Sequence, residues 1–448
     1  MNDKMNWKEN VDETVQNIVR LVQAETINPP GNELPAILIV KDILEKAGFP
    51  QEAFTIVESA PNRVNLVARL RGDGSKRPLL LSGHVDVVPV ERDKWKHDPF
   101  GGEIIDGEIW GRGTLDMKGF LAMYLQVFLM LFRQGVPLKR DIILAAIADE
   151  EAGMIHGSRF LVDEHRDLID AEYGLTEGGA MTVYMGKLRA YPIQVAEKGV
   201  CWVQARARGE PGHGSMPTPD SAVLRLARGL ERLRKAGHLP VHLTPTVRQM
   251  LQAIVGQRGF PASLLLPLVN SEAVISMLIN RTKGMTRGML LSMTTNTVSP
   301  NMLQAGLKTN VIPSVAEATL DCRTLPGQSA EDAMREVQAI MGDEIELEKV
   351  VSWDGPEFPM DTDLYRLLVR ETQKMDPSGV VTPMMTPGAT DARQYQRAGI
   401  KVYGFTPGLL PPELPILRMA HGHDERMPIL YIESGLPTLW NVVHEFCA

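Results

Sequence analysis

The sequence predicts an α/β protein in which a mostly parallel sheet is sandwiched by helices and a smaller α+β domain is inserted into the chain. Up to about residue 197, short apolar runs alternate with helical segments, which is the pattern of parallel strands joined by helices. Near residue 198 apolar and polar residues alternate instead, and the first pattern resumes after residue 324. The 448 residues also exceed the roughly 250–300 that one core holds. We therefore expect one domain from 1–197 and 325–448, and a second from 198–324.

The elements of the first domain follow from the spacing of apolar residues. The first helical pattern ends where Pro29 and Pro30 interrupt it, and a second helix follows. Continuous apolar runs of strand length come next, separated by a long helical segment. We expect helices over 9–25, 34–47 and 118–135, and strands over 64–70, 79–82 and 142–148.

The predicted insert begins with a half-exposed strand over 199–208 and a turn-rich loop over 209–215. A helix over about 220–236 and a strand-like stretch over 308–323 complete its outline. The segment 239–303 between them is rich in methionine, a flexible side chain suited to irregular apolar surfaces. Core packing or a subunit interface is the favoured interpretation, and an apolar wall for an acyl chain is the alternative. The residues concerned are Met250, Phe260, Leu264, Leu265, Leu266, Met277, Met285, Met289, Met293 and Met302.

Composition narrows the class of protein. The net charge of −8, from 55 acidic and 47 basic residues, disfavours nucleic acid as the main partner. No apolar run approaches the roughly 18 residues of a membrane span, and the first residues lack a signal-peptide core. Three cysteines are too few for a disulfide framework, so we expect a cytoplasmic protein.

Acidic and histidine residues follow three of the apolar runs. The run at 79–83 ends in His84, the run at 142–148 is followed by Glu150 and Glu151, and the run at 173–176 is followed by Glu177. The glycine-rich segment 111–119 contributes Asp116. Because ligands bind at the carboxyl ends of the strands in an open α/β sheet, we expect one shared site. Its mixture of carboxylates and imidazole suits Zn²⁺.

Two neighbouring residues fit supporting roles in such a site. Asp86 lies two positions after His84, so both side chains point the same way on an extended chain, and Asp86 can hold the second imidazole nitrogen. A turn cap is the structural alternative for Asp86. Glu150 can face the water at the metals as general base while Glu151 binds metal, or it can be a solvated neighbour of Glu151.

Three segments together carry a family resemblance. Residues 82–89 (SGHVDVVP), 113–119 (GTLDMKG) and 149–153 (DEEAG) resemble motifs of the di-zinc amidohydrolases, which include aminoacylase-1, carboxypeptidase G, acetylornithine deacetylase and succinyl-diaminopimelate desuccinylase. The resemblance covers almost the whole chain. Residues 309–313 (TNVIP) and 388–393 (GATDAR) are similar to the branch of carboxypeptidase S and the N-acyl amino acid hydrolases.

The resemblance implies which residues bind the metals and which one acts as base. Asp116 would bridge two Zn²⁺ ions, for which Co²⁺ or Mn²⁺ are alternatives. His84 and Glu177 would complete one site, and Glu151 with a C-terminal histidine the other. His421 has the family's spacing to the acidic pair at 424–425, and His423 is the alternative. Glu150 would act as general base and then as acid.

The resemblance also implies substrate contacts. His213, in the lid loop 212–217 (GHGSMP), would cross to a partner subunit and stabilise the oxyanion, or it is only a turn residue. Asn310 would bind substrate, or it only makes hydrogen bonds at a strand end. Arg323 would hold a carboxylate, or it pairs with Asp321 or Glu317. Gly388 and Arg393 would belong to a substrate loop.

Together these expectations describe a metal-dependent hydrolase that cleaves an amide or peptide bond beside a free carboxylate, working as a homodimer through the inserted lid and dimerisation domain. An N-acyl amino acid amidohydrolase is favoured, and a dipeptidase or carboxypeptidase of the same family is the alternative. A catalytically silent relative that binds peptides is the rival of another class, although no ligand or base is missing. A two-metal phosphoesterase fits poorly because no glycine-rich phosphate cradle stands out.

Overall fold

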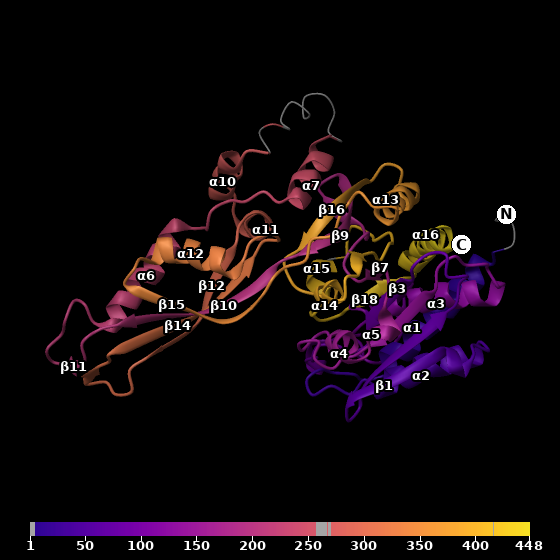
Figure 1. The fold of residues 1–448 in the computed structure, drawn as a ribbon, viewed down its shortest axis with the longest axis horizontal. Helices are drawn as coiled ribbons and strands as arrows, with labels where there is room; N and C mark the ends of the chain where they lie inside the picture. Colours follow the sequence, from indigo (N-terminus) through magenta and orange to yellow (C-terminus); the bar gives the residue numbers. More distant parts are fainter. Residues whose placement is uncertain (1–4, 257–266, 268–269, 415) are drawn as a thin grey trace. The chain divides into compact units, whose positions relative to one another are not determined.

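The computed structural model describes residues 5–256, 267, 270–414 and 416–448, and the chain divides into two compact units (Figure 1). Unit 1 comprises residues 1–195, 358–382 and 390–448, and unit 2 comprises 196–357 and 383–389. Unit 2 therefore continues past residue 324, where the sequence placed the end of the insert. The reason is that the helix and strand after residue 324 pack against unit 2 strands.

Unit 1 is built on a sheet whose centre is parallel. β6, β3, β7 and β17 pair in parallel, and antiparallel strands flank them on both sides. β9 and β16 continue past the boundary of the unit. In sheet order the strands are β1 (Phe54–Ala60), β2 (Arg63–Leu70), β6 (Ile142–Ile147), β3 (Leu79–His84), β7 (Tyr173–Thr176), β17 (Lys401–Gly404), β9 (Leu188–Glu197) and β16 (Val380–Thr386), with β8 (Val183–Met185) paired to β9.

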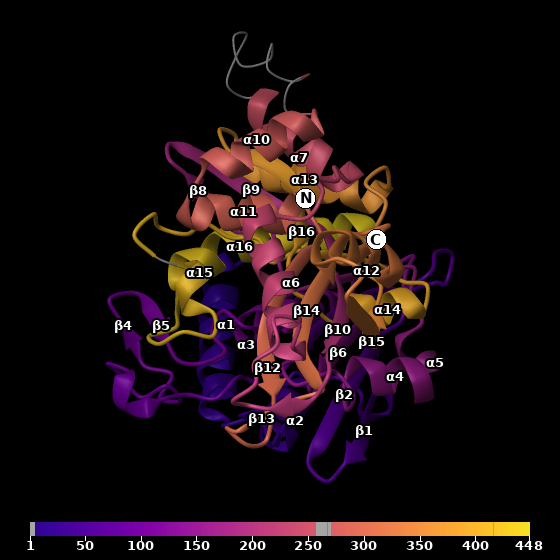
Figure 2. The same cartoon turned by 90° about the vertical axis from the view of Figure 1, so that its left-hand side faces the viewer.

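Helices cover both faces of this sheet, which is why its central strands are fully buried. Viewed along the sheet, α1 and α3 lie on one side and α4 and α5 on the other (Figure 2). The helices of unit 1 are α1 (Trp7–Gln23), α2 (Leu34–Lys46), α3 (Lys118–Gln134), α4 (Ser158–Glu164), α5 (Arg166–Ile169), α13 (Asp363–Met375), α14 (Ala392–Arg397), α15 (Ile416–Met419) and α16 (Ile429–Cys447), with short 3-10 turns at η1 (Gln51–Ala53) and η2 (Arg92–Lys94).

A small antiparallel sheet ties the C-terminal part of unit 1 to its N-terminal half. It consists of β4 (Ile104–Ile105), β5 (Glu108–Trp110) and β18 (Arg426–Pro428). Arg426 is opposite Trp110 in the register. This pairing brings the chain just before β18 beside the chain just after β5, although the two are remote in sequence.

Unit 2 contains a four-stranded antiparallel sheet in the order β12 (Thr297–Ala305), β14 (Val315–Thr324), β10 (Gly199–Arg208) and β15 (Ile345–Trp353). Burial alternates along β14, as expected for a sheet with one covered face. The covered face packs against α6 (Ala222–Ala236) and α12 (Ala330–Met341). β11 (Gly212–His213) and β13 (Val311–Ile312) form a separate two-stranded sheet.

The methionine-rich segment forms α7 (Pro245–Gly256), α10 (Glu272–Arg281), α11 (Gly284–Thr294) and the start of β12. Met277, Met289 and Met302 are exposed within unit 2, so they do not form its core. Met250 and Met293 are half-buried. Phe260, Leu264, Leu265 and Leu266 lie outside the described residues, and nothing is described of the Met285 side chain.

The predicted fold class is confirmed: the large sheet is parallel at its centre, helices sandwich it, and unit 2 mixes helices with an antiparallel sheet. Among the helices that the structure describes, none is long and apolar enough to cross a bilayer. Cys201, Cys322 and Cys447 are buried free thiols.

Candidate metal centre

Three adjacent parallel strands deliver the central side chains of the candidate site. β3 lies between β6 and β7, and the three strands run in the same direction. His84 is the last residue of β3, Glu150 and Glu151 follow β6, and Glu177 follows β7 directly. Their carboxyl ends therefore meet at one edge, as the sequence predicted for an open α/β sheet.

Two groups of three side chains converge there and share Asp116. His84, Asp116 and Glu177 form one group, and Asp116, Glu151 and His421 form the other. The Nε2 atom of His84 lies 3.2 Å from Oδ1 of Asp116, and Nε2 of His421 lies 3.1 Å from Oδ2 of the same carboxylate. Each Asp116 oxygen thus faces a different histidine, which is the geometry of a bridging carboxylate.

The remaining donor distances fit a pair of metal ions. Glu177 Oε2 lies 3.6 Å from His84 Nε2, and Glu151 Oε2 lies 3.1 Å from His421 Nε2. Two donors on one tetrahedral zinc, each at about 2.0–2.2 Å, are about 3.3–3.5 Å apart. Oε1 of Glu151 is buried and has no hydrogen-bond partner among the described residues. A buried carboxylate oxygen left in this state is costly unless a cation meets it.

The pKa shifts of the clustered side chains also favour a cation site. Burial, together with the charge of Asp116, raises the pKa of Glu177 to about 8. Although burial opposes it, hydrogen bonds with His421 and His84 hold the pKa of Asp116 well below its usual range. Hydrogen bonds to Asp116 and then Glu151 raise the pKa of His421 to about 10. A cation bound among these carboxylates would favour their ionised forms and so offset the raised pKa of Glu177.

Glu150, the predicted general base, precedes Glu151 in the turn after β6. Its backbone N–H donates to Asp86 Oδ1 at 3.1 Å, which fixes the turn after β6. Burial raises the pKa of its carboxyl well above the usual range, and the negative charge of Glu177 adds to this shift. The Glu150 carboxyl is therefore in electrostatic contact with the cluster.

Asp86 is completely buried behind His84. The Nδ1 atom of His84 is 3.0 Å from the backbone carbonyl oxygen of Asp86 and 3.5 Å from its carboxylate. The imidazole is thus oriented chiefly by the carbonyl, while the carboxylate accepts from the N–H groups of Glu150 and Glu151, each at 3.1 Å. Asp86 links two of the three converging strands.

Only one of the two candidate C-terminal histidines reaches the cluster. His421 reaches Asp116 and Glu151, whereas Nε2 of His423 lies 3.4 Å from Glu91 Oε2. His421 adopts a left-handed backbone with φ of 59°. Because β18 pairs with β5, the segment before β18, which contains His421, lies beside the loop that contains Asp116.

Glu425 is a supporting residue to which sequence reasoning gave no role. Its buried carboxylate accepts from the N–H groups of Gly113 at 3.1 Å, Leu115 at 2.7 Å and Asp116 at 3.2 Å, and it also pairs with Arg112. It therefore shapes the loop that presents Asp116. Its place four residues after His421 was the available signal.

Asp391 is a second such residue. It is buried, it accepts a hydrogen bond from Ser158, and burial raises its pKa to about 6. Its charge also contributes to the raised pKa of Glu150 and Glu177. Sequence reasoning placed Asp391 in a substrate loop but assigned it no role.

The other predicted residues lie mostly in unit 2. His213 is exposed on β11, where its Nδ1 accepts from the Ser215 N–H at 3.2 Å. The exposed Asn310 accepts the Gly214 N–H at its carbonyl at 2.9 Å, so the structure brings the His213 and Asn310 chains together. Gly388 also belongs to unit 2, and Arg393 is the second residue of α14 in unit 1.

Arg323 is half-buried on β14, and its guanidinium pairs with Asp321 two residues earlier. Nε and Nη2 lie 2.8 and 3.2 Å from the two Asp321 oxygens. The structure therefore shows the alternative in which Arg323 pairs with Asp321. One face of the fork is engaged by this pairing, which any carboxylate ligand of Arg323 would share or displace.

Comparison with known proteins identifies the family of this chain. It belongs to the peptidase family M20/M25/M40, whose model matches residues 80–447. A probable carboxypeptidase S-like 2 from Dictyostelium discoideum is 31% identical over 82% of this chain and 71% of its own length. The human N-fatty-acyl-amino acid synthase/hydrolase PM20D1 is 28% identical over 83% and 74%, and porcine (Sus scrofa) aminoacylase-1 is 27% identical over 91% and 88%. The predicted family and branch are confirmed.

Solved structures share the fold. The metallo-carboxypeptidase Sso-CP2 of Sulfolobus solfataricus superimposes with a TM-score of 0.67 at 16% identity, covering 97% of this chain and 99% of that one. Human carnosine dipeptidase 1 gives 0.65 at 16% identity, covering 98% and 96%. The Bacillus subtilis YXEP protein, described as a dinuclear metal-binding peptidase, gives 0.57 at 15% identity, covering 97% and 98%. The expectation of a metallohydrolase related to aminoacylases and carboxypeptidases is confirmed at the level of the family.

Proposed function

We propose that this protein hydrolyses the amide bond of N-acyl amino acids with two divalent metal ions, Zn²⁺ in the first place. The observation that carries the proposal is the Asp116 carboxylate, which presents one oxygen to the His84 group and the other to the His421 group. A shared carboxylate between two sets of N and O donors suits a two-metal hydrolase. Co²⁺ and Mn²⁺ accept the same donors.

The substrate class rests on the relatives. Two of the named relatives, the N-fatty-acyl-amino acid synthase/hydrolase and aminoacylase-1, act by their names on acylated amino acids. Met277 on α10 and Met289 on α11 are exposed apolar side chains of unit 2, of the kind that suits contact with an acyl chain. A substrate with one apolar arm and one carboxylate matches these features.

Asp116 with His84 and Glu177, and with Glu151 and His421, would hold the two metals, which would supply Lewis-acid polarisation of the scissile carbonyl and a lowered pKa for the attacking water. Glu150 takes the proton from that water and then passes it to the leaving nitrogen. Asp86 holds the Glu150 N–H and thereby the direction of the side chain.

In this proposal the substrate contacts come from residues of unit 2 and from Arg393 of unit 1. His213 stabilises the developing oxyanion from a partner subunit, and Asn310 holds the substrate near it. Arg323 binds the free carboxylate of the amino acid, exchanging its contact with Asp321 for the ligand. Gly388 and Arg393 line the loop beside the amino-acid side chain.

A substrate panel tests the function. Purified protein dialysed with zinc is assayed with N-lauroyl and N-acetyl amino acids and with dipeptides. We expect the highest kcat/KM on an N-acyl amino acid. Faster turnover of dipeptides favours the dipeptidase or carboxypeptidase alternative, and zinc binding without turnover of any member favours a catalytically silent peptide-binding relative.

The same proposal includes a homodimer formed through unit 2. β12 is an edge strand of its sheet, and Met302 and Leu303 on it are each 67% exposed. An exposed edge strand presents unpaired backbone N–H and C=O groups, which are a template for pairing with a second copy. Light scattering should report a dimer that Leu303→Lys converts to a monomer, whereas Leu38→Lys on the exposed side of α2 should leave it dimeric. A monomeric wild-type protein would refute this part. A cytoplasmic location remains a prediction from the sequence.

A further inference from the structure

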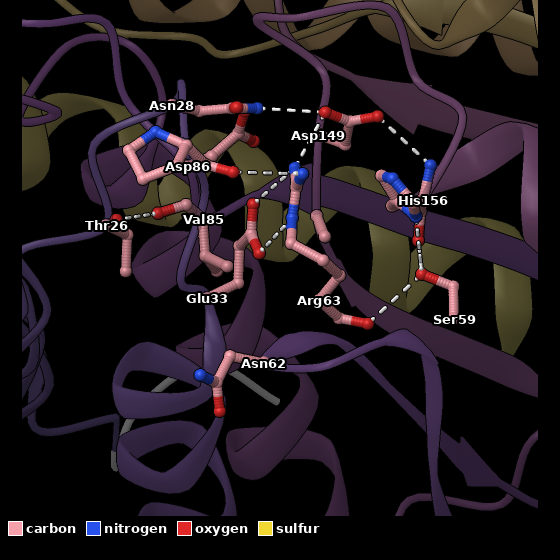
Figure 3. A network of polar contacts seen from close by, with 12 residues as sticks. Thr26, Asn28, Glu33, Ser59, Asn62, Arg63, Val85, Asp86, Asp149 and His156 are labelled. Carbon is pink, nitrogen blue, oxygen red and sulfur yellow. Dashed lines mark hydrogen bonds and ion pairs between the residues drawn. The ribbon is translucent and has the colours of Figure 1, made fainter.

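A buried polar network includes Asp149, the residue directly before Glu150 and Glu151 (Figure 3). It consists of Glu33, Arg63, Asp149, Asn28 and Asp86, which are called the Arg63 network below. Their exposed fractions are 0%, 9%, 3%, 2% and 0%. Apart from Asp86, none of these residues contributes to the chemistry proposed above. Buried charges seldom stabilise a fold better than apolar side chains do, so a network of this size calls for another role.

The guanidinium of Arg63 joins two carboxylates. Its Nε and Nη2 donate to Glu33 at 2.8 and 2.9 Å, and Nη2 also donates to Asp149 Oδ1 at 2.7 Å. Figure 3 shows the guanidinium between the two acidic side chains. This fork geometry is specific to arginine, since a lysine ammonium is a point charge without fixed directions.

Asn28 carries the network from Asp149 to Asp86. Its single amide nitrogen donates to Asp149 Oδ1 at 2.9 Å and to Asp86 Oδ2 at 2.8 Å. Both amide hydrogens are used in this way, one for each carboxylate. The backbone of the segment around Asn28 runs beside the chain after His84, with the Asn28 N–H donating to Val87 O at 2.8 Å.

Asp149 sets the direction of the turn after β6. Its φ of 64° is left-handed, a region that residues other than glycine rarely occupy. The side chain is held on both oxygens, because Oδ2 accepts the His156 N–H at 3.0 Å. The next two N–H groups, of Glu150 and Glu151, then point at the Asp86 carboxylate.

We propose that Glu33, Arg63, Asp149 and Asn28 are positioning residues that hold the Glu150–Glu151 turn in register with His84. The network fixes both ends of the turn, at Asp149 and through the Asp86 carboxylate. It thereby aims the base Glu150 and the ligand Glu151 at the Asp116 cluster. The inference rests on the proposed function for the roles of Glu150 and Glu151, and it adds residues remote from the reacting atoms to the machinery of the enzyme.

The test compares two identical substitutions. Arg63→Lys removes the fork from the network. Arg140→Lys is the matched control, because Arg140 is 8% exposed and pairs with Glu172 at 2.7 Å elsewhere in unit 1. We expect Arg63→Lys to lower kcat about 10–100-fold, with KM changed less than about 3-fold, and to weaken zinc binding in equilibrium dialysis about 10-fold. Arg140→Lys should lower the melting temperature and leave kcat and zinc affinity unchanged.

The outcomes separate this inference from the proposed function. Wild-type kcat and zinc affinity in folded Arg63→Lys overturn the inference, as does an equal loss in Arg140→Lys. If Arg63→Lys does not fold, Asn28→Ser, which changes no charge, is measured in its place and should show the same loss. Wild-type protein that binds zinc but cleaves no panel substrate overturns the proposed function alone, and the dialysis arm still decides the inference. Wild-type protein that binds no zinc overturns both.

Discussion

Asp116 shows how a single residue gains its role from residues far away in the sequence. Three backbone N–H groups around it donate to Glu425, while its own two oxygens turn toward His84 and His421. Sequence reasoning identified Asp116, His84 and Glu177 because motif and strand-end signals are local. It could not identify Arg63, since the partners of Arg63 are set by packing rather than by spacing, and it used Glu425 only for its spacing to His421.

The role of Glu150 can be tested by one substitution. Glu150→Gln keeps the size of the side chain and the N–H contact to Asp86, but it cannot take a proton. We expect kcat to fall about 10²–10⁴-fold, the usual contribution of a general base, while zinc content stays at the wild-type value. Steady-state kinetics and metal analysis provide the two readouts. Activity within a few-fold of wild type would show that another group is the base.

The two C-terminal histidines form a built-in comparison. His421→Ala removes a donor that lies 3.1 Å from both Asp116 and Glu151, so we expect weaker binding of one zinc equivalent and loss of activity. His423→Ala removes only an exposed contact with Glu91 and should leave both unchanged. Zinc titration of the metal-free variants measures the difference. The reverse result would move the ligand to His423.

At the scale of elements, the longer apolar strands and helices of the N-terminal half were predictable, and the pairing of short strands remote in sequence was not. The apolar runs that became β2, β3, β6 and α3 were visible as periodic segments of the expected length. β18 and β5 are only three residues each, too short for a periodic signal, yet their pairing brings His421 to the site. The edge strand β1, with little buried surface, was also missed.

Gly157 packs so closely against the chain just after β6 that a larger side chain does not fit. A Cβ there would lie 1.7 Å from the carbonyl oxygen of Ala148, the residue before Asp149. We expect Gly157→Ala to lower the free energy of unfolding by about 1–3 kcal/mol in urea denaturation. Gly288→Ala, in the exposed α11 with open space at the Cβ, should be neutral or stabilise by up to about 1 kcal/mol. Equal effects of the two substitutions would contradict this packing argument.

At the scale of the whole molecule, the change of pattern near residue 198 was readable, but the end of the second unit was not. α12 and β15 read as ordinary helix and strand, and only their packing on β10 assigns them to unit 2. Contacts between segments remote in sequence decide such boundaries, and a single sequence carries no direct record of them.

The charge of the cluster predicts how the stability of metal-free protein depends on pH. The folded-state pKa values of Glu177, about 8, and His421, about 10, both lie above their ordinary values of 4.5 and 6.5. A raised folded pKa stabilises the fold below the unfolded value and loses this effect as the pH rises through the folded value. The melting temperature of metal-free protein should therefore fall between about pH 5 and pH 10, and zinc should restore it. A metal-free melting temperature that rises over this range would contradict the assigned cluster.

The central claim is that the carboxyl ends of β3, β6 and β7, with the loops of Asp116 and His421, hold two metal ions around one shared carboxylate. Anomalous diffraction at the zinc edge, from crystals grown with zinc, tests it most directly. We expect two peaks about 3.5–4 Å apart, with Asp116 between them, His84 and Glu177 at one, and Glu151 and His421 at the other. A single peak, or peaks away from Asp116, would contradict the account.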